Sequence, residues 1–218
     1  KIIDLNTGDQ PMYSFDKNIV LVFNGEIYNY LEIKEILVKR GHKFYTTSDT
    51  EVIINSYLEW GYECQSKFNG MWAFALWDKR KEKLFLSRDR IGEKPLFYSV
   101  FNNSLFFGSE MKSIFAGEVP KDIDSELTEI YLALSYIPGE KTFYKNIYQL
   151  LPGHFIIADK QGITEKKYWD LPEIDEDNMY SNKKLINEKF LYLLEDSVKI
   201  RMRSDVPFGA FLSGGLDS

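Results

Sequence analysis

Four short apolar segments in the middle of the chain constrain its fold more than any other feature. Polar turns separate these segments, which cover residues 71–77, 84–87, 96–100 and 105–107. Such spacing is typical of consecutive β-strands. The connections contain Asp or Asn, which tolerate the left-handed conformations of tight turns, so antiparallel pairing is expected. Several segments are apolar on both alternating faces, which predicts two sheets enclosed between helices.

Upstream of these segments, the sequence predicts one strand followed by two helices. Residues 19–23 are β-branched and aromatic, as in a buried strand, and the turn Asn24-Gly25-Glu26 follows them. Asn29 and Glu32 are spaced like a capping box that opens the first helix, and Gly41 stands where this helix would end. Its inward side is expected to comprise Leu31, Ile36 and Leu37.

The second helix is predicted by the same signals. Ser48 and Glu51 form another capping-box pattern, and Gly61 closes the segment. One face of this helix is expected to hold Val52, Ile53, Ser56, Tyr57 and Trp60. Two later helices, over residues 109–116 and 125–136, would each begin at a serine cap.

The C-terminal third of the chain indicates a domain boundary. A hairpin is expected over residues 155–159 and 163–169, after which residues 170–178 are acidic and contain a proline, as in an interdomain linker. Helical periodicity returns over residues 181–203, and residues 207–212 are predicted to form a strand. The predicted organisation is a first domain over residues 1–168, a linker over 169–182 and the start of a second domain over 183–218.

Composition excludes several classes of protein. With 27 basic and 33 acidic residues, the net charge of −6 disfavours binding to nucleic acid or to an anionic membrane. A 16% share of aromatic residues argues against disorder. Cys64, His42 and His154 fall short of a structural zinc set, and the single cysteine suits a reducing cytoplasm. No apolar run approaches the roughly 20 residues that cross a bilayer. The chain begins with Lys1, which suggests an excerpt of a longer protein.

The sharpest motif is Ser213-Gly214-Gly215-Leu216-Asp217-Ser218, which follows the last predicted strand. Two adjacent glycines let backbone N–H groups approach an anion closely, and the flanking hydroxyls add donors. A carboxylate such as Asp217 could hold Mg²⁺ beside a phosphate. Spacing alone favours an ordinary strand-to-helix turn, and the absence of a Walker lysine excludes the GTPase type of phosphate loop.

The motif resembles the pyrophosphate loop of the ATP-pyrophosphatase superfamily, whose members activate a carboxylate or carbonyl oxygen as an adenylate. This resemblance implies that the loop holds the phosphates of ATP and that Asp217 places Mg²⁺. It also implies that the backbone of the preceding strand lies near the adenine. The implied ATP-binding residues are Leu212, Ser213, Gly214, Gly215, Asp217 and Ser218.

A second candidate site combines the Asn24-Gly25-Glu26 turn with Asp49 in the segment Thr47-Ser48-Asp49-Thr50-Glu51. An asparagine amide and a glycine N–H can converge on one carbonyl oxygen as an oxyanion hole, and a buried carboxylate can pair with an ammonium group. Spacing alone favours a capped strand-turn-helix over any such site.

Both segments resemble the glutamine site of class II, N-terminal-nucleophile (Ntn) amidotransferases. The resemblance implies a four-layer αββα sandwich of two antiparallel sheets, of class α+β. It also implies that Asn24 and Gly25 hold the oxyanion, that Asp49 binds the amino group of glutamine, and that Glu26 adds backbone contacts. Further matches occur at residues 68–78, 88–96 and 151–154. Residues 88–96 could support the site or act in it directly, or form a solvated loop, and His154 is expected to be a packing residue.

A glutaminase domain followed by this pyrophosphate loop is the order found in glutamine-hydrolysing asparagine synthetases. The resemblance implies a cytoplasmic ligase that uses glutamine, aspartate and ATP with Mg²⁺, and leaves a homodimer open. The family nucleophile is an N-terminal cysteine, and this chain has Lys1 there, so the 218 residues alone are expected to be inactive. Cys64 is expected to be a core residue. A related amidotransferase with a sugar or peptide-like acceptor, or a non-catalytic binding module, remains an alternative.

Overall fold

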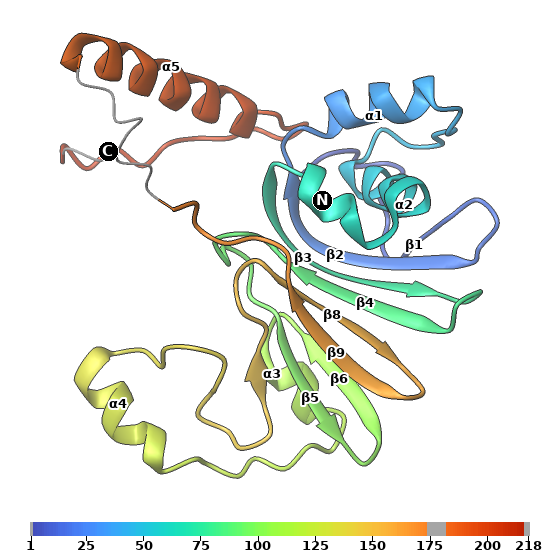
Figure 1. Cartoon of the computed structure of the whole chain (residues 1–218), viewed down its shortest axis with the longest axis vertical. Coiled ribbons are helices and arrows are strands. Elements are labelled where there is room, and N and C mark those ends of the chain that lie inside the picture. The colour runs from blue at the N-terminus through green and yellow to red at the C-terminus, as the bar shows by residue number, and fades with distance from the viewer. Residues whose placement is uncertain (1, 174–181, 216–218) are drawn as a thin grey trace.

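Nine strands form two antiparallel sheets in the computed structural model, which describes residues 2–173 and 182–215 (Figure 1). The larger sheet has the order β1-β2-β3-β4-β8-β9, and the smaller one has the order β6-β5-β7. The strands of the larger sheet are β1 (Met12–Tyr13), β2 (Ile19–Ile27), β3 (Gly70–Asp78), β4 (Lys83–Arg88), β8 (His154–Asp159) and β9 (Gly162–Lys167). Those of the smaller sheet are β5 (Phe97–Phe101), β6 (Ser104–Gly108) and β7 (Tyr148–Gln149).

Three apolar clusters define the layers. The first lies between the larger sheet and the helices α1 (Tyr30–Lys39) and α2 (Asp49–Trp60), and it includes Trp72 and Phe74 of β3. The second joins the two sheets and includes Ala73 and Ala75 from the opposite face of β3. The third packs the smaller sheet against α3 (Met111–Phe115). The order helix, sheet, sheet, helix confirms the predicted αββα sandwich, and it explains why β3 is apolar on both faces.

The strands predicted before residue 170 are confirmed with small shifts at their ends, and Gly61 ends α2 as expected. The inward side predicted for α1 is wrong in part. Leu31 and Ile36 are about half exposed, and the buried residues are Ile33 and Leu37, which lie one turn apart on the same face.

Neither predicted capping box forms. The Asn29 side chain donates to the Lys67 carbonyl and accepts from Asn69 N, so it joins two loops instead of capping α1. Ser48 does cap α2 by accepting from Thr50 N. Glu51 accepts from backbone N–H groups of the preceding loop instead of reaching back to Ser48. Hydrogen bonds to loop residues therefore replace the bonds of the predicted capping boxes.

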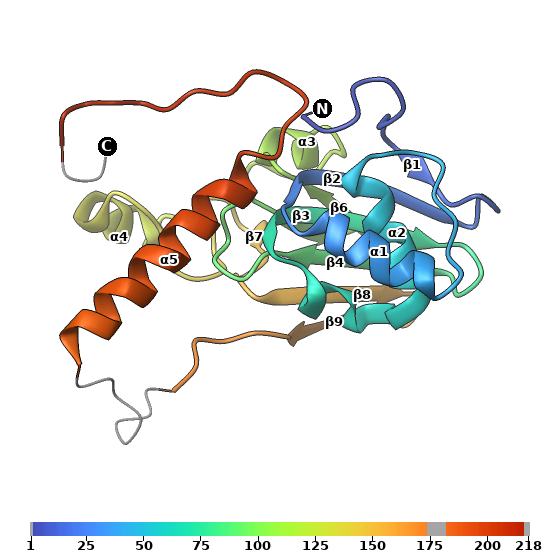
Figure 2. The ribbon, with the colours of Figure 1, turned by 90° about the horizontal axis from the view of Figure 1, so that it is seen from above.

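Two of the later helices begin without a serine cap. The helix α3 follows Glu110, and α4 (Glu126–Leu134) follows Ser125, which makes no side-chain capping bond. The last helix, α5 (Lys183–Arg201), is capped by Asn182, whose oxygen accepts from the N–H groups of Lys184 and Leu185. Its apolar side is exposed within the described part of the chain. Figures 1 and 2 show α5 standing apart from both sheets.

The strand predicted over residues 207–212 is wrong for the described structure. These residues form no β-ladder, and Phe211 and Leu212 are largely exposed. A strand needs a neighbour to receive its backbone hydrogen bonds, and none of the described strands lies beside this segment. No helix in the described ranges is both long and apolar enough to traverse a lipid bilayer.

Candidate functional site

A cavity of about 180 Å³ lies where β2 ends and α2 begins. The structure brings Asn24, Gly25, Glu26 and Asp49 together in its lining, as the sequence predicts. Its other lining residues are Ile2, Ile3, Gly8, Gln10, Phe23, Ser48 and Thr50. Of these, Ile2 and Ile3 could not be predicted from the sequence as part of the cavity. Their side chains have no reactive group, and they meet the other lining residues only in the folded chain.

Close approach of β2 and β3 explains the glycine at position 25. Gly25 has φ +150° and pairs with Trp72, and a Cβ atom there would lie 2.0 Å from the carbonyl oxygen of Met71. Gly70 meets the same constraint from the other strand, because its Cβ would lie 2.1 Å from the carbonyl oxygen of Glu26. These two glycines fix the strand end that carries Asn24 and Glu26 against its neighbour.

Asp49 is the first residue of α2 and is 5% exposed. Its Oδ2 accepts a hydrogen bond of 3.0 Å from Ile27 N, which ties the helix start to the end of β2. Burial raises the pKa of the Asp49 carboxyl, although the backbone N–H groups of Ile27 and Thr50 oppose this shift. A buried carboxylate with incomplete compensation favours a cationic partner.

Glu26 places a second carboxyl group in the cavity. The residue is 8% exposed, and burial raises its pKa, with the charge of Asp49 adding to the effect and Lys94 opposing it. Two acidic groups therefore share one small space of negative potential. Such a space suits the ammonium group of an amino acid better than an anion.

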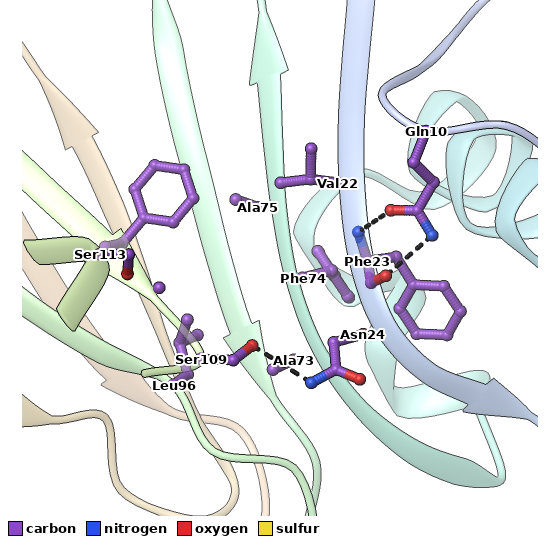
Figure 3. Close-up of a pocket in the computed structure, with 12 residues that line it drawn as sticks. Gln10, Val22, Phe23, Asn24, Ala73, Phe74, Ala75, Leu96, Ser109 and Ser113 are labelled. Atoms are coloured by element: carbon purple, nitrogen blue, oxygen red, sulfur yellow. Dashed lines mark hydrogen bonds between the residues drawn. The ribbon is translucent and has the colours of Figure 1, made fainter. Parts of the chain in front are cut away.

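Asn24 stands between this cavity and a larger, mainly apolar one. Its Nδ2 donates to Ser109 Oγ at 3.2 Å, and Figure 3 shows the amide reaching across the gap between the two sheets. The second cavity has a volume of about 360 Å³. Its apolar lining includes Val22, Ala73, Phe74, Ala75, Leu96 and Phe107. The side-chain amide of Gln10 holds the adjacent part of β2. It donates to the carbonyl oxygen of Phe23 and accepts from Phe23 N.

The loop over residues 88–96 is structural, so its interpretation as a solvated loop is wrong. The Asp89 carboxylate is almost fully buried and accepts five backbone N–H groups, those of Trp72, Ile91, Gly92, Glu93 and Lys94. The Arg88 guanidinium donates to three carbonyl groups, those of Gly92, Lys94 and Leu150. This loop brings the charge of Lys94 close enough to offset part of the rise in the pKa of Glu26.

Cys64 and His154 lie outside the cavity lining. Cys64 is fully buried in the 3₁₀ helix Gly61–Lys67, and burial raises the pKa of its thiol, so a reactive thiolate is disfavoured. Its interpretation as a core residue is confirmed. The Nδ1 atom of His154 lies 2.8 Å from the carbonyl oxygen of Pro152, a contact within its own loop.

The double-glycine loop is open in the described structure. Gly214 has φ +79°, and no atom lies within 4 Å of the position of a Cβ, so its backbone is accessible. Leu212 is exposed, and Gly215 N donates to Ser213 Oγ at 3.4 Å. Asp217 and Ser218 lie outside the described residues. Within residues 2–173 and 182–215, no cluster of three His, Cys, Asp or Glu side chains is arranged for a metal ion.

Comparisons with known families divide the chain in two. Residues 1–169 match the family described as "Glutamine amidotransferase domain", and residues 189–218 match the family described as "Asparagine synthase".

Curated relatives match along the whole chain. It is 46% identical over 239 aligned residues to "Putative asparagine synthetase [glutamine-hydrolyzing] 2" of Methanocaldococcus jannaschii, with 100% of this chain and 45% of that protein covered. It is 39% identical to "Asparagine synthetase [glutamine-hydrolyzing] 1" of Bacillus subtilis, covering 100% of this chain and 34% of the relative. "Amidase chyE" of Penicillium rubens is 36% identical, with 100% and 32% covered. The chain thus spans less than half the length of these relatives.

Solved structures share the fold. The glutamine phosphoribosylpyrophosphate amidotransferase of B. subtilis aligns with a TM-score of 0.52 at 19% identity, covering 73% of this chain and 32% of that one. A structure described as the allosteric regulatory enzyme of purine biosynthesis aligns with a TM-score of 0.55, also at 19% identity, covering 73% and 31%. At this identity the likeness supports the Ntn-hydrolase fold and nothing finer.

Proposed function

The chain belongs to the glutamine amidotransferase domain family, and on that premise we propose that its parent protein is a glutamine-hydrolysing asparagine synthetase. The reaction would convert glutamine, aspartate and ATP into asparagine, glutamate, AMP and pyrophosphate. In this assignment residues 1–168 form the glutaminase domain, 169–182 the linker and 183–218 the start of the synthetase domain. The observation that carries the proposal is the convergence of Asn24, Gly25 and Asp49 on one small acidic cavity.

The residues of the cavity have distinct proposed roles. Asp49 would bind the ammonium group of glutamine, because its carboxyl group is buried and a cationic partner would stabilise its charged form. The resemblance implies backbone contacts from Glu26, and its buried carboxyl group supports a second role, as a further partner of the same ammonium group. The Asn24 amide and Gly25 N–H would donate to the oxyanion that forms when the side-chain amide of glutamine is attacked. The attacking thiol would be that of the family's N-terminal cysteine, since Cys64 is buried away from the cavity.

ATP would bind at the double-glycine loop, through Leu212, Ser213, Gly214 and Gly215 together with Asp217 and Ser218. The accessible backbone of Gly214 fits a loop that presents N–H groups to phosphate oxygens. Bound ATP would supply the adenylyl group that activates the aspartate side chain. Mg²⁺ is proposed at Asp217, a carboxylate of the type that this ion prefers.

We also propose a cytoplasmic protein that binds neither nucleic acid nor membrane. The single buried cysteine and the net charge of −6 support the compartment and the lack of attraction to polyanions. One second candidate is an amidotransferase with a sugar or peptide-like acceptor, since the relative Amidase chyE does not carry the name of an asparagine synthetase.

Product analysis of the purified full-length parent protein tests the proposal. With glutamine, aspartate and ATP, we expect asparagine, AMP and pyrophosphate to form in equal amounts, together with glutamate. Omitting aspartate should abolish asparagine and AMP formation. Formation of AMP with another carboxylate but not with aspartate would favour the second candidate. If neither glutamate nor AMP forms, the chain belongs to a non-catalytic binding module instead.

A further inference from the structure

A short turn after α5 reaches back to the glutamine amidotransferase part of the chain. The Arg203 guanidinium donates to both carboxylate oxygens of Glu32, at 2.7 and 2.5 Å, and to the carbonyl oxygen of Tyr28. These residues are 171 and 175 positions apart in the sequence. Figure 2 shows the chain leaving α5 and passing beside the N-terminal segment.

Asp205, two residues further on, makes the second contact. Its N–H donates to the carbonyl oxygen of Ile2 at 3.0 Å, and its Oδ2 accepts from Asp4 N at 2.8 Å. Ile2 lines the acidic cavity. The turn Arg203–Asp205 therefore holds the wall of the cavity directly through Asp205 and holds the segment after β2 through Arg203.

Each contact continues by hydrogen bonds to the segment that carries Asp49. On the Asp205 side, the Asp4 carboxylate accepts from Thr47 N at 2.8 Å, two residues before Asp49. Hydrogen bonds from Thr7 and Thr47 hold the pKa of Asp4 well below its usual range. The carboxyl group therefore stays ionised, and both of its oxygens can accept hydrogen bonds.

On the Arg203 side, the bonded carbonyl belongs to Tyr28, and the N–H of the preceding residue, Ile27, donates to Asp49 Oδ2. Burial raises the pKa of the Tyr30 phenol, and the charges of Asp205 and Asp49 raise it further.

The geometry of these contacts suits positioning better than stability. Glu32 is more than half exposed, and an exposed ion pair adds little to the free energy of unfolding. A two-pronged contact between guanidinium and carboxylate does, however, fix orientation. The Arg201 guanidinium also lies 4.8 Å from the ring centroid of Tyr28, so the end of α5 covers this residue as well.

We propose that Arg203 and Asp205 are positioning residues for the glutamine cavity, supplied by the segment that leads into the double-glycine loop. The cavity is then fully formed only while this turn is docked, so glutamine binding depends on the placement of the synthetase part of the chain. This inference rests on the proposed glutaminase function. Neither residue touches the substrate, and each acts through Tyr28, Glu32, Ile2 or Asp4.

Steady-state kinetics of the full-length parent protein test the inference with R203M and D205A. We expect each substitution to raise KM for glutamine by roughly tenfold, as for a lost charge-assisted hydrogen bond, with a smaller change in kcat. Asparagine synthesis from ammonium chloride should stay at the wild-type rate, because that reaction bypasses the glutamine cavity. D205N, which keeps an acceptor oxygen for Asp4 N, should recover most of the loss.

Two further variants separate positioning from a general loss of structure. The charge exchange E32R/R203E should recover only part of the loss in R203M, because a carboxylate at position 203 cannot donate to the carbonyl oxygen of Tyr28, whereas E32R alone should raise KM. K184A removes an ion pair with Glu188 on the same helix, α5, and should leave KM unchanged. An unchanged KM in both R203M and D205A, with an active wild type, would overturn the inference. A wild-type protein that hydrolyses no glutamine would instead contradict the proposed function.

Discussion

At the scale of single residues, the acidic cavity is a site where stability and binding oppose each other. Glu26 and Asp49 are both buried, and the proximity of Asp49 raises the pKa of Glu26. Two carboxylates in one cavity repel each other and would attract the ammonium group of the proposed substrate. A residue kept for binding is thus expected to lower stability.

Glu26→Gln should stabilise the parent protein at pH 7, by roughly 2–4 °C in the Tm of the glutaminase domain, and raise KM for glutamine. The folded protein binds a proton at Glu26 more readily than the unfolded chain, whose pKa is near 4.5. Wild-type stability therefore rises relative to the variant as pH falls through the raised pKa toward 4.5. Calorimetry at several pH values measures the difference. A variant less stable than wild type at pH 7 would contradict this account, and Glu63→Gln, at an exposed carboxylate, is the control.

Gly25→Ala should destabilise the protein by about 3 kcal/mol or more, because the added methyl group would meet the backbone of β3. Gly41→Ala is the matched control. Gly41 also has positive φ, at +94°, but nothing lies within 4 Å of its Cβ position, so only backbone strain of about 1 kcal/mol is expected. Urea unfolding of both variants measures the loss in the free energy of unfolding. Equal losses would show that backbone strain, and not contact with β3, accounts for the glycine at position 25.

The site could be predicted from sequence as far as local motifs reach. Asn24, Gly25 and Glu26 stand together in one turn, and Asp49 lies at a recognisable helix start, so resemblance located all four. Ile2 and Asp4 were not predicted as part of the site or its support, whereas Lys94 lies in the segment 88–96, for which support of the site was one prediction. Ile2 and Asp4 approach through loops that are distant in sequence, and nothing in their own segments indicates which cavity they face.

At the scale of elements, most strands followed from periodicity, whereas the two capping boxes did not form. Alternating burial and short polar turns are local properties, so the sequence contains them. The side chain of Asn29 donates to a loop carbonyl group, and that of Glu51 accepts from loop N–H groups. Both side chains bind these loops instead of the helix ends that the sequence pattern predicts. The segment 207–212 has the composition of a strand but no partner among the described residues, and composition cannot supply one.

Asp89→Ala tests the element that supports Lys94. Removing this carboxylate leaves five backbone N–H groups without their acceptor, and we expect a loss of about 3 kcal/mol in the free energy of unfolding. Asp170→Ala, which breaks an exposed ion pair with Lys167, should cost under about 1 kcal/mol. Similar losses for the two variants, measured by urea unfolding, would mean that water replaces the Asp89 carboxylate without penalty.

At the scale of the whole molecule, the αββα sandwich places one acidic cavity at the end of strand β2 in its larger sheet, and the chain then continues toward the double-glycine loop. The turn Arg203–Asp205 connects the two parts by hydrogen bonds on both sides of the cavity. The central claim is that this cavity supplies nitrogen to a ligase formed by the rest of the parent protein.

Transfer of isotope from glutamine labelled with ¹⁵N in its side-chain amide tests that claim most directly. Mass spectrometry should find the label in asparagine made by the wild-type parent protein. In Asp49→Asn, which weakens the site for the ammonium group of glutamine, transfer should fall by roughly a hundredfold, while unlabelled ammonium chloride still supports synthesis. Asparagine without label in the wild type, or undiminished transfer in the variant, would contradict the account.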